Sequence, residues 1–206
     1  MNFQSPRITL DGATYNGTAY FEKTAASTDN SSGNNIFNQQ TTIANSGPGD
    51  FRHGVSALDT YNADLIIANS GAGAIAMARN TAGNIFNGNI QVNSTAGNGV
   101  SFGTGNGTST LAAGRTIAIG VSGFSTGILE LRNFTQTGAT PQNLTLTGTA
   151  LLQVGTNSTF NGNVTFVSPQ VLLQGCSYMA PHTSRRMATA TTPALATTSS
   201  TTLPPS

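Results

Sequence analysis

Charged side chains are scarce in this chain of 206 residues. Lys, Arg, Asp and Glu together make up 7% of the sequence, against about 25% in a typical soluble domain. The formal net charge is +1, so the chain has no excess of one sign of the kind that attracts nucleic acid or an anionic membrane. We therefore expect no nucleic-acid partner.

Other residue types and patterns are absent as well. Trp is missing, and the single Cys, Cys176, excludes an internal disulfide framework and a zinc site built from cysteines. No apolar run approaches the roughly 20 residues of a membrane helix, so membrane insertion is not expected. No N-terminal stretch joins basic residues to an apolar run, as a secretory signal does. The hydrophobic fraction is 37%, with too much Ile, Val, Leu and Phe for a disordered chain.

What the chain does contain is a repeat, marked by an aromatic residue followed by Asn. The first four of these pairs start 22, 24 and 25 residues apart, and the fifth lies 74 residues further on, which leaves room for three units, two of them degenerate. Short alternating stretches such as 89–93 and 99–103 read as strands, and Gly/Asn-rich stretches such as 45–49, 69–73 and 93–97 read as turns. The pairs are Tyr15-Asn16, Phe37-Asn38, Tyr61-Asn62, Phe86-Asn87 and Phe160-Asn161.

This pattern predicts an all-β solenoid, and a right-handed parallel β-helix with coils of about 22–25 residues is the form we expect. One unit cannot bury its apolar face alone, whereas stacked units share a continuous core. Stacking places like residues above one another, which Asn and Thr tolerate and charges do not. A β-sandwich with strands every 8–12 residues is the alternative, but a fixed period of this length disfavours it.

A longer period lies over the short one. Residues 3–12, FQSPRITLDG, read like residues 166–175, FVSPQVLLQG, at a constant offset of 163 residues. We therefore expect residues 1–175 to be a solenoid array that is one slice of a longer array with a 163-residue super-repeat. Neighbouring solenoid copies are then candidate partners.

Several strings resemble repeats of large surface proteins of Bacteroidota. They are GTAYFEK at 17–23, GNNIFN at 33–38, AGNIFNGN at 82–89 and TSTLAAGRTI at 108–117. The resemblance covers about residues 3–175 and is specific as a repeat family without carrying any chemistry. It implies an extracellular or cell-surface β-solenoid of adhesin-like or structural role, with surface glycans as possible partners.

One polar cluster suggests chemistry: Asp50, Arg52 and His53, with Asp59 nearby. In a strand, Asp50 and Arg52 would share one face and His53 the other, which favours a solvated ion pair at a corner over a catalytic site. A glycoside hydrolase needs two facing carboxylates, and stacking of Asp59 on a neighbouring coil leaves that alternative open. The remaining carboxylates are scattered singly: Asp11, Glu22, Asp29, Asp64 and Glu130.

Other candidate motifs have structural explanations. The run 103–107, GTGNG, precedes no helix and is predicted to be a turn and not a dinucleotide loop. Calcium-binding Gly-rich nonapeptides are absent, so we expect no metal and no cofactor. Thr145, Thr147 and Thr149 alternate with Leu144, Leu146 and Gly148. They would suit a flat hydroxyl face for ice or a crystalline polysaccharide, although Thr is also a common strand residue.

The composition changes after residue 175. From Cys176 to Ser206, Asn and Gly disappear, and Thr, Ala, Ser and Pro dominate, as in a flexible linker. The genetic code offers a second interpretation. Back-translation of residues 179–186 with free third bases, read in a shifted frame, permits GTAYFEKN, which matches 17–23 at the same offset of 163. The shifted reading of 187–205 permits a stretch close to SSGNNIFN of 31–38.

We therefore predict that the reading frame slips between about residues 175 and 179. Residues 176–206 would then be an out-of-frame copy of the next repeat, disordered, with no function for Cys176, His182 or the pair Arg185-Arg186. Taken together, the sequence predicts a non-enzymatic surface-protein segment that extends, displays or adheres. A polysaccharide-binding or polysaccharide-acting β-helix, and an ice- or glycan-binding Thr face, are the alternatives.

Overall fold

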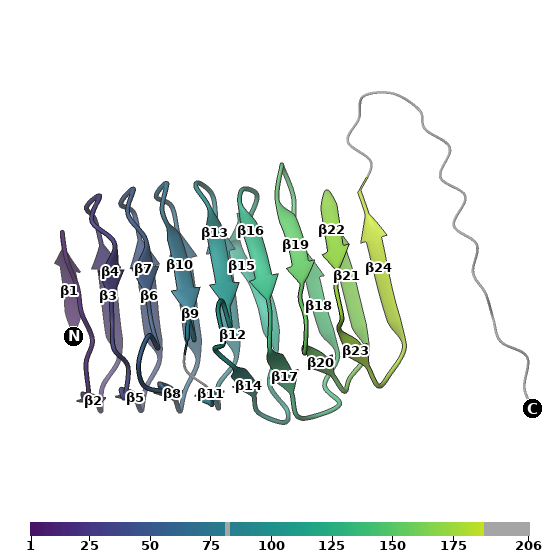
Figure 1. Ribbon diagram of the computed structural model, residues 1–206, viewed down its shortest axis with the longest axis horizontal. Helices are drawn as coiled ribbons and strands as arrows, with labels where there is room; N and C mark the ends of the chain where they lie inside the picture. The colour runs from purple at the N-terminus through teal and green to yellow at the C-terminus, as the bar shows by residue number, and fades with distance from the viewer. Residues whose placement is uncertain (81–82, 188–206) are drawn as a thin grey trace, which may run out of the picture.

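The structure is a computed structural model that describes residues 1–80 and 83–187. The regular secondary structure of the described residues consists of short strands, and every strand pairs in parallel with its neighbours. The strands stack side by side along one axis, from β1 at the N-terminal end to β24 at the other (Figure 1). This arrangement is a β-solenoid. A β-sandwich would pair antiparallel strands, so that alternative is wrong.

The strands lie on three sides of the solenoid, and each coil from β3 to β23 contributes one strand to each side. Side 1 is β1 (Asn2–Ser5), β3 (Ala19–Lys23), β6 (Thr41–Asn45), β9 (Leu65–Asn69), β12 (Ile90–Ser94) and β15 (Ile117–Phe124), and beyond it β18 (Gln142–Thr145), β21 (Val164–Ser168) and β24 (His182–Arg186). Side 2 is β4 (Asp29–Asn30), β7 (Phe51–Arg52), β10 (Ala74–Met77), β13 (Gly99–Phe102), β16 (Ile128–Leu131), β19 (Leu151–Val154) and β22 (Gln170–Leu173). Side 3 is β2 (Thr14–Tyr15), β5 (Ile36–Phe37), β8 (Thr60–Tyr61), β11 (Asn84–Phe86), β14 (Ser109–Leu111), β17 (Phe134–Gln136), β20 (Thr159–Phe160) and β23 (Ser177–Tyr178).

The aromatic–Asn pairs of the sequence lie on side 3, where the aromatic ring points inward. Rings in successive coils stack nearly parallel, with centroids 5.0 Å apart for Tyr15–Phe37, 4.6 Å for Phe37–Tyr61 and 5.2 Å for Tyr61–Phe86. In the two degenerate units, Leu111 and Gln136 occupy the same column and are fully buried. The repeat motif is therefore the inner column of a continuous core.

Asn side chains also close the corner between sides 1 and 2. Asn45 Nδ2 donates to the Gly49 carbonyl at 3.0 Å, and its Oδ1 accepts from the Gly47 N–H. Asn69 repeats the first contact with the Gly73 carbonyl at 2.8 Å. These bonds satisfy main-chain groups that the tight turn removes from the strand ladder.

The structure corrects the predicted boundary at residue 175. Residues 176–187 continue the coil, because β23 pairs with β20 and β24 pairs with β21. All five residues of β24 are exposed, so the strand is held by main-chain hydrogen bonds, which do not depend on side-chain identity. Residues 188–206, the rest of the predicted tail, lie outside the described residues.

The 163-residue super-repeat is visible in the strand register. Asn2 pairs with Tyr20 between β1 and β3, and Thr165 pairs with Thr183 between β21 and β24. Both residues of the second pair lie 163 positions after those of the first. The glycine that ends the sequence match takes the same left-handed conformation at both places, with φ of 71° at Gly12 and 65° at Gly175.

Candidate functional site

The polar cluster predicted from the sequence forms an ion pair at the corner after side 1. Arg52 Nη2 lies 2.7 Å from Asp50 Oδ2, and both side chains are partly exposed. The other Asp50 oxygen accepts from the Ala74 N–H of the next coil at 3.0 Å. Burial raises the pKa of Asp50, but the hydrogen bond from Ala74 and the pairing with Arg52 together outweigh it, so the pKa is lowered from its ordinary value. Asp50 therefore fastens one coil to the next.

His53 points the other way, as the alternation of the strand predicts. Its side chain is fully buried beside Phe51, with ring centroids 4.3 Å apart. Neither ring nitrogen has a hydrogen-bond partner. Burial lowers the pKa of His53 from 6.5 to about 3, so the ring is neutral at pH 7. A neutral ring enclosed in the core cannot reach a substrate, and it acts here as an apolar side chain.

Asp59 is buried in an inner column of side 3. It is stacked between Asn35, whose N–H and Nδ2 both lie 2.9 Å from Asp59 Oδ1, and Asn84, whose Oδ1 accepts from the Asp59 N–H at 2.8 Å. Burial raises the pKa of Asp59 to about 6, while hydrogen bonds from Asn35 and Gly54 oppose the rise. The residues stacked directly on Asp59 are thus amides, and the carboxylate stacking left open by the sequence is not observed there.

The described residues contain no group of three His, Cys, Asp or Glu side chains placed to hold a metal ion. Residues 103–107 form a turn before β14, as predicted, with φ of 70° at Gly103 and 73° at Gly105. No described helix is long and apolar enough to cross a membrane.

A buried lysine was not anticipated. The Lys23 side chain is fully buried at the corner between sides 1 and 2, where Nζ donates to the carbonyls of Ala25 and Gly49. Lys23 pairs in register with Asn45, and Asn45 pairs with Asn69, so the lysine takes the place that the corner Asn has in later coils. An alignment of residues 17–23 with the stretches that end in Asn45 and Asn69 would have predicted that Lys23 lies at this buried corner.

The outer surface of side 3 carries an ordered row of β-branched and hydroxyl side chains. One residue of every strand points outward, and these residues pair in register from coil to coil. None is charged, and their spacing is that of the strands, about 4.8 Å. The row is Thr14, Ile36, Thr60, Ile85, Thr110, Thr135, Thr159 and Ser177, which we call the hydroxyl row.

A ladder of Asn side chains runs beside the first four members of the hydroxyl row, two residues after each of them. Asn38 Nδ2 donates to Asn16 Oδ1 at 2.8 Å, Asn62 to Asn38 at 2.8 Å, and Asn87 to Asn62 at 2.9 Å. We call it the amide ladder. Amide stacking of this kind holds coils in register without charge.

The hydroxyl row is not where the sequence suggested. Thr145, Thr147 and Thr149 are exposed, but only Thr145 lies in a strand, and the other two follow it around a corner. Threonines that alternate along one strand all belong to the same coil. A flat face that runs along the solenoid needs hydroxyl side chains at equivalent positions of successive coils.

Comparisons with known proteins give no further identification. The chain matches no protein-family model, and no curated protein or solved structure is significantly similar to it.

Proposed function

We propose that this chain is a non-enzymatic structural segment of a secreted or cell-surface repeat protein, which extends or displays other parts and presents lateral faces for adhesion. The observation that supports this proposal is the continuity of side-chain columns along the solenoid axis. The aromatic column, the amide ladder and the corner amides each connect successive coils. A molecule built this way extends along one axis, and each coil is held by its neighbours.

The chemistry of the polar cluster is consistent with a structural role. Asp50 binds a neighbouring coil, His53 is neutral and enclosed, and Asp59 is stacked between amides. General acid–base catalysis needs a group within hydrogen-bond reach of a substrate, and both His53 and Asp59 are buried.

The hydroxyl row favours a second candidate, binding to a flat, regular polysaccharide surface. The row is uncharged and spans all eight strands of side 3, and an array with one repeated spacing suits a partner that is itself periodic. Ice is a weaker fit, because Ile36 and Ile85 interrupt the hydroxyls.

Sedimentation with insoluble polysaccharides, together with a reducing-sugar assay, separates the functions. A purely structural segment stays in the supernatant and releases no sugar. If the second candidate holds, the chain sediments with cellulose or chitin, and Thr110→Lys/Thr135→Lys abolishes this because two charges break the row. Asn143→Lys/Thr165→Lys, on exposed positions of side 1, is the matched control and should change nothing. Release of reducing sugar would contradict the proposal.

Limited proteolysis provides a positive test of the structural role. Because the described coils are joined by short corners, trypsin should cut slowly after Arg52 of β7 and after the corner arginines Arg79 and Arg115 under native conditions. Rapid cleavage there would mean that the coils are hinged, which a rigid extension cannot be.

A further inference from the structure

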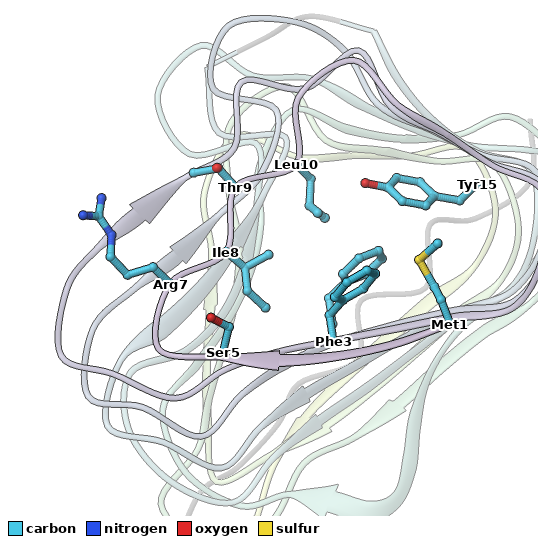
Figure 2. A pocket seen from close by; sticks show the side chains of 9 residues that line it. Met1, Phe3, Ser5, Arg7, Ile8, Thr9, Leu10 and Tyr15 are labelled. Carbon is cyan, nitrogen blue, oxygen red and sulfur yellow. The ribbon is translucent and has the colours of Figure 1, made fainter.

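The N-terminal end of the solenoid is an open apolar face. A hollow of about 440 Å³ is lined there by Met1, by residues of β1, β2 and the segment between them, and by Phe21 of β3. Figure 2 shows Met1, Phe3, Ile8, Leu10 and Tyr15 pointing into this hollow, while Arg7 points away. β1 pairs with β3 on one side only, so its other edge has main-chain groups without a strand partner.

The same face exists a second time inside the molecule, where it is covered. Residues 164–178 are equivalent to residues 1–15 through the offset of 163, as the register of β21 and β24 shows. Phe3 is 52% exposed, whereas its equivalent Phe166 is 0% exposed. The difference arises because β18, β19 and β20 stack on β21, β22 and β23.

We propose that the N-terminal face is a docking surface for a second copy of the 163-residue unit, which covers it with the coil formed by residues 142–163. The two copies then form one continuous solenoid, with β18 beside β1, β19 beside residues 7–10, and β20 beside β2. This inference goes beyond the proposed function and does not depend on it.

The apolar side chains of the two surfaces match in this arrangement. Within the chain, Leu144 pairs with Phe166, Leu152 with Val171, and Phe160 with Tyr178, whose rings stack 6.0 Å apart. The equivalents of Phe166, Val171 and Tyr178 on the N-terminal face are Phe3, Ile8 and Tyr15. Each is apolar or aromatic, so these three side chains of the docking coil meet side chains of the same character.

The main-chain hydrogen bonds match as well. Leu146 N–H donates to the Val167 carbonyl at 2.8 Å, Ser177 N–H to the Ser158 carbonyl at 2.8 Å, and Met179 N–H to the Phe160 carbonyl at 2.9 Å. The equivalents of Val167, Ser177 and Met179 are Gln4, Thr14 and Asn16. Their main-chain groups point to the open side, because the adjacent residues Ser5, Ala13 and Tyr15 accept from the next coil.

The amide ladder also continues across the junction. Within the ladder each Asn donates to the Asn of the preceding coil, so the Nδ2 group of Asn16 points toward the open face. In the docked arrangement its neighbour is Asn161, which follows Phe160 as Asn16 follows Tyr15. Asn161 uses Nδ2 to contact the Thr137 carbonyl at 3.4 Å, which leaves Oδ1 to accept from Asn16.

The test adds residues 142–163 in front of Met1 of the full chain and measures amide hydrogen exchange. The amides of Asn2, Gln4 and Thr14 should exchange at least about tenfold more slowly than in the unextended chain, since they gain acceptors in the added coil. The matched control carries the same extension with Leu144→Ser, Leu152→Ser and Phe160→Ser in the added coil, and should give no protection.

Two results would overturn the proposal: unchanged exchange with the intact extension, or equal protection with both extensions. Slow exchange at Ile67 and Val92, in the buried centre of the solenoid, serves as the internal standard that the chain itself remains folded. The polysaccharide sedimentation test depends on the hydroxyl row of side 3 and not on the N-terminal face, so the two proposals can fail separately.

Discussion

At the scale of single residues, two of the buried titratable side chains, His53 and Asp59, have opposite effects on stability. His53 is neutral in the folded chain and has a pKa lowered to about 3, so its contribution is fully present above pH 6.5 and falls as the pH drops toward 3. Asp59 has a pKa raised to about 6, so its contribution is fully present below pH 3.8 and is lost as the pH rises through 6. Between pH 3.8 and about pH 6 the two pH dependences of the unfolding free energy have opposite signs and cancel.

We therefore predict opposite pH dependences for two variants. Relative to the unsubstituted chain, His53→Leu should lose unfolding free energy as the pH rises from 4 to 6, because only the Asp59 effect remains. Asp59→Asn should gain it over the same interval, each with a slope of up to about 1.4 kcal/mol per pH unit. Urea unfolding at several pH values measures both slopes, and slopes of the same sign would contradict the assigned burial.

Glycine at a corner sets how closely coils approach. A Cβ on Gly71 would lie 2.2 Å from the Gly47 carbonyl oxygen of the preceding coil, a separation that requires the backbone to move. Gly71→Ala should therefore lower the free energy of unfolding by about 1–3 kcal/mol. Gly17 is the matched site, because a Cβ there would have no neighbouring atom within 4 Å, and Gly17→Ala should be neutral. Equal losses of unfolding free energy at both positions would mean that Gly71 is not required for the close approach of neighbouring coils.

At the scale of strands, the sequence predicted strands where a side-chain pattern repeats and missed those after residue 175, among them β24, which has no such pattern. The alternating stretches 89–93 and 99–103 became β12 and β13, because each has one face to bury. β24 has no such face, and only its register with β21 places it. Lys23 was missed for a related reason: lysine is expected on the surface, while here its Nζ donates to two carbonyls of a buried corner.

β24 also yields a prediction about the frame slip. Ser184 pairs with Phe166 as Phe21 pairs with Phe3, whose rings stack 5.8 Å apart. Ser184→Phe, the residue that the shifted frame permits, should raise the free energy of unfolding by about 1 kcal/mol by covering Phe166 and Tyr178. Thr183→Phe, which points outward, should not. The encoding DNA provides the independent check: its third bases must spell the repeat in the shifted frame, or the slip did not occur.

At the scale of the whole molecule, the sequence period predicted the architecture. It did not predict a function, because the repeated residues are those that form the core and the corners. A 24-residue period requires stacked coils to bury its apolar face, and the aromatic column shows how the motif does so. The degenerate units keep the column with Leu111 and Gln136, which no motif search would find. The hydroxyl row was not predicted because it runs across coils, and neighbouring members lie 18 to 25 residues apart in sequence.

The central claim is that coils stack in parallel and in register along one straight axis. Spin labels on the hydroxyl row test it most directly, in a Cys176→Ser background with Thr14→Cys paired in turn with Thr60→Cys, Thr110→Cys and Thr159→Cys. These positions lie two, four and six strands from β2, so the mean distance should rise by about 10 Å at each step, with narrow distributions. A Thr14–Thr159 distance no longer than the Thr14–Thr110 distance would show that the chain folds back on itself, and would contradict the solenoid.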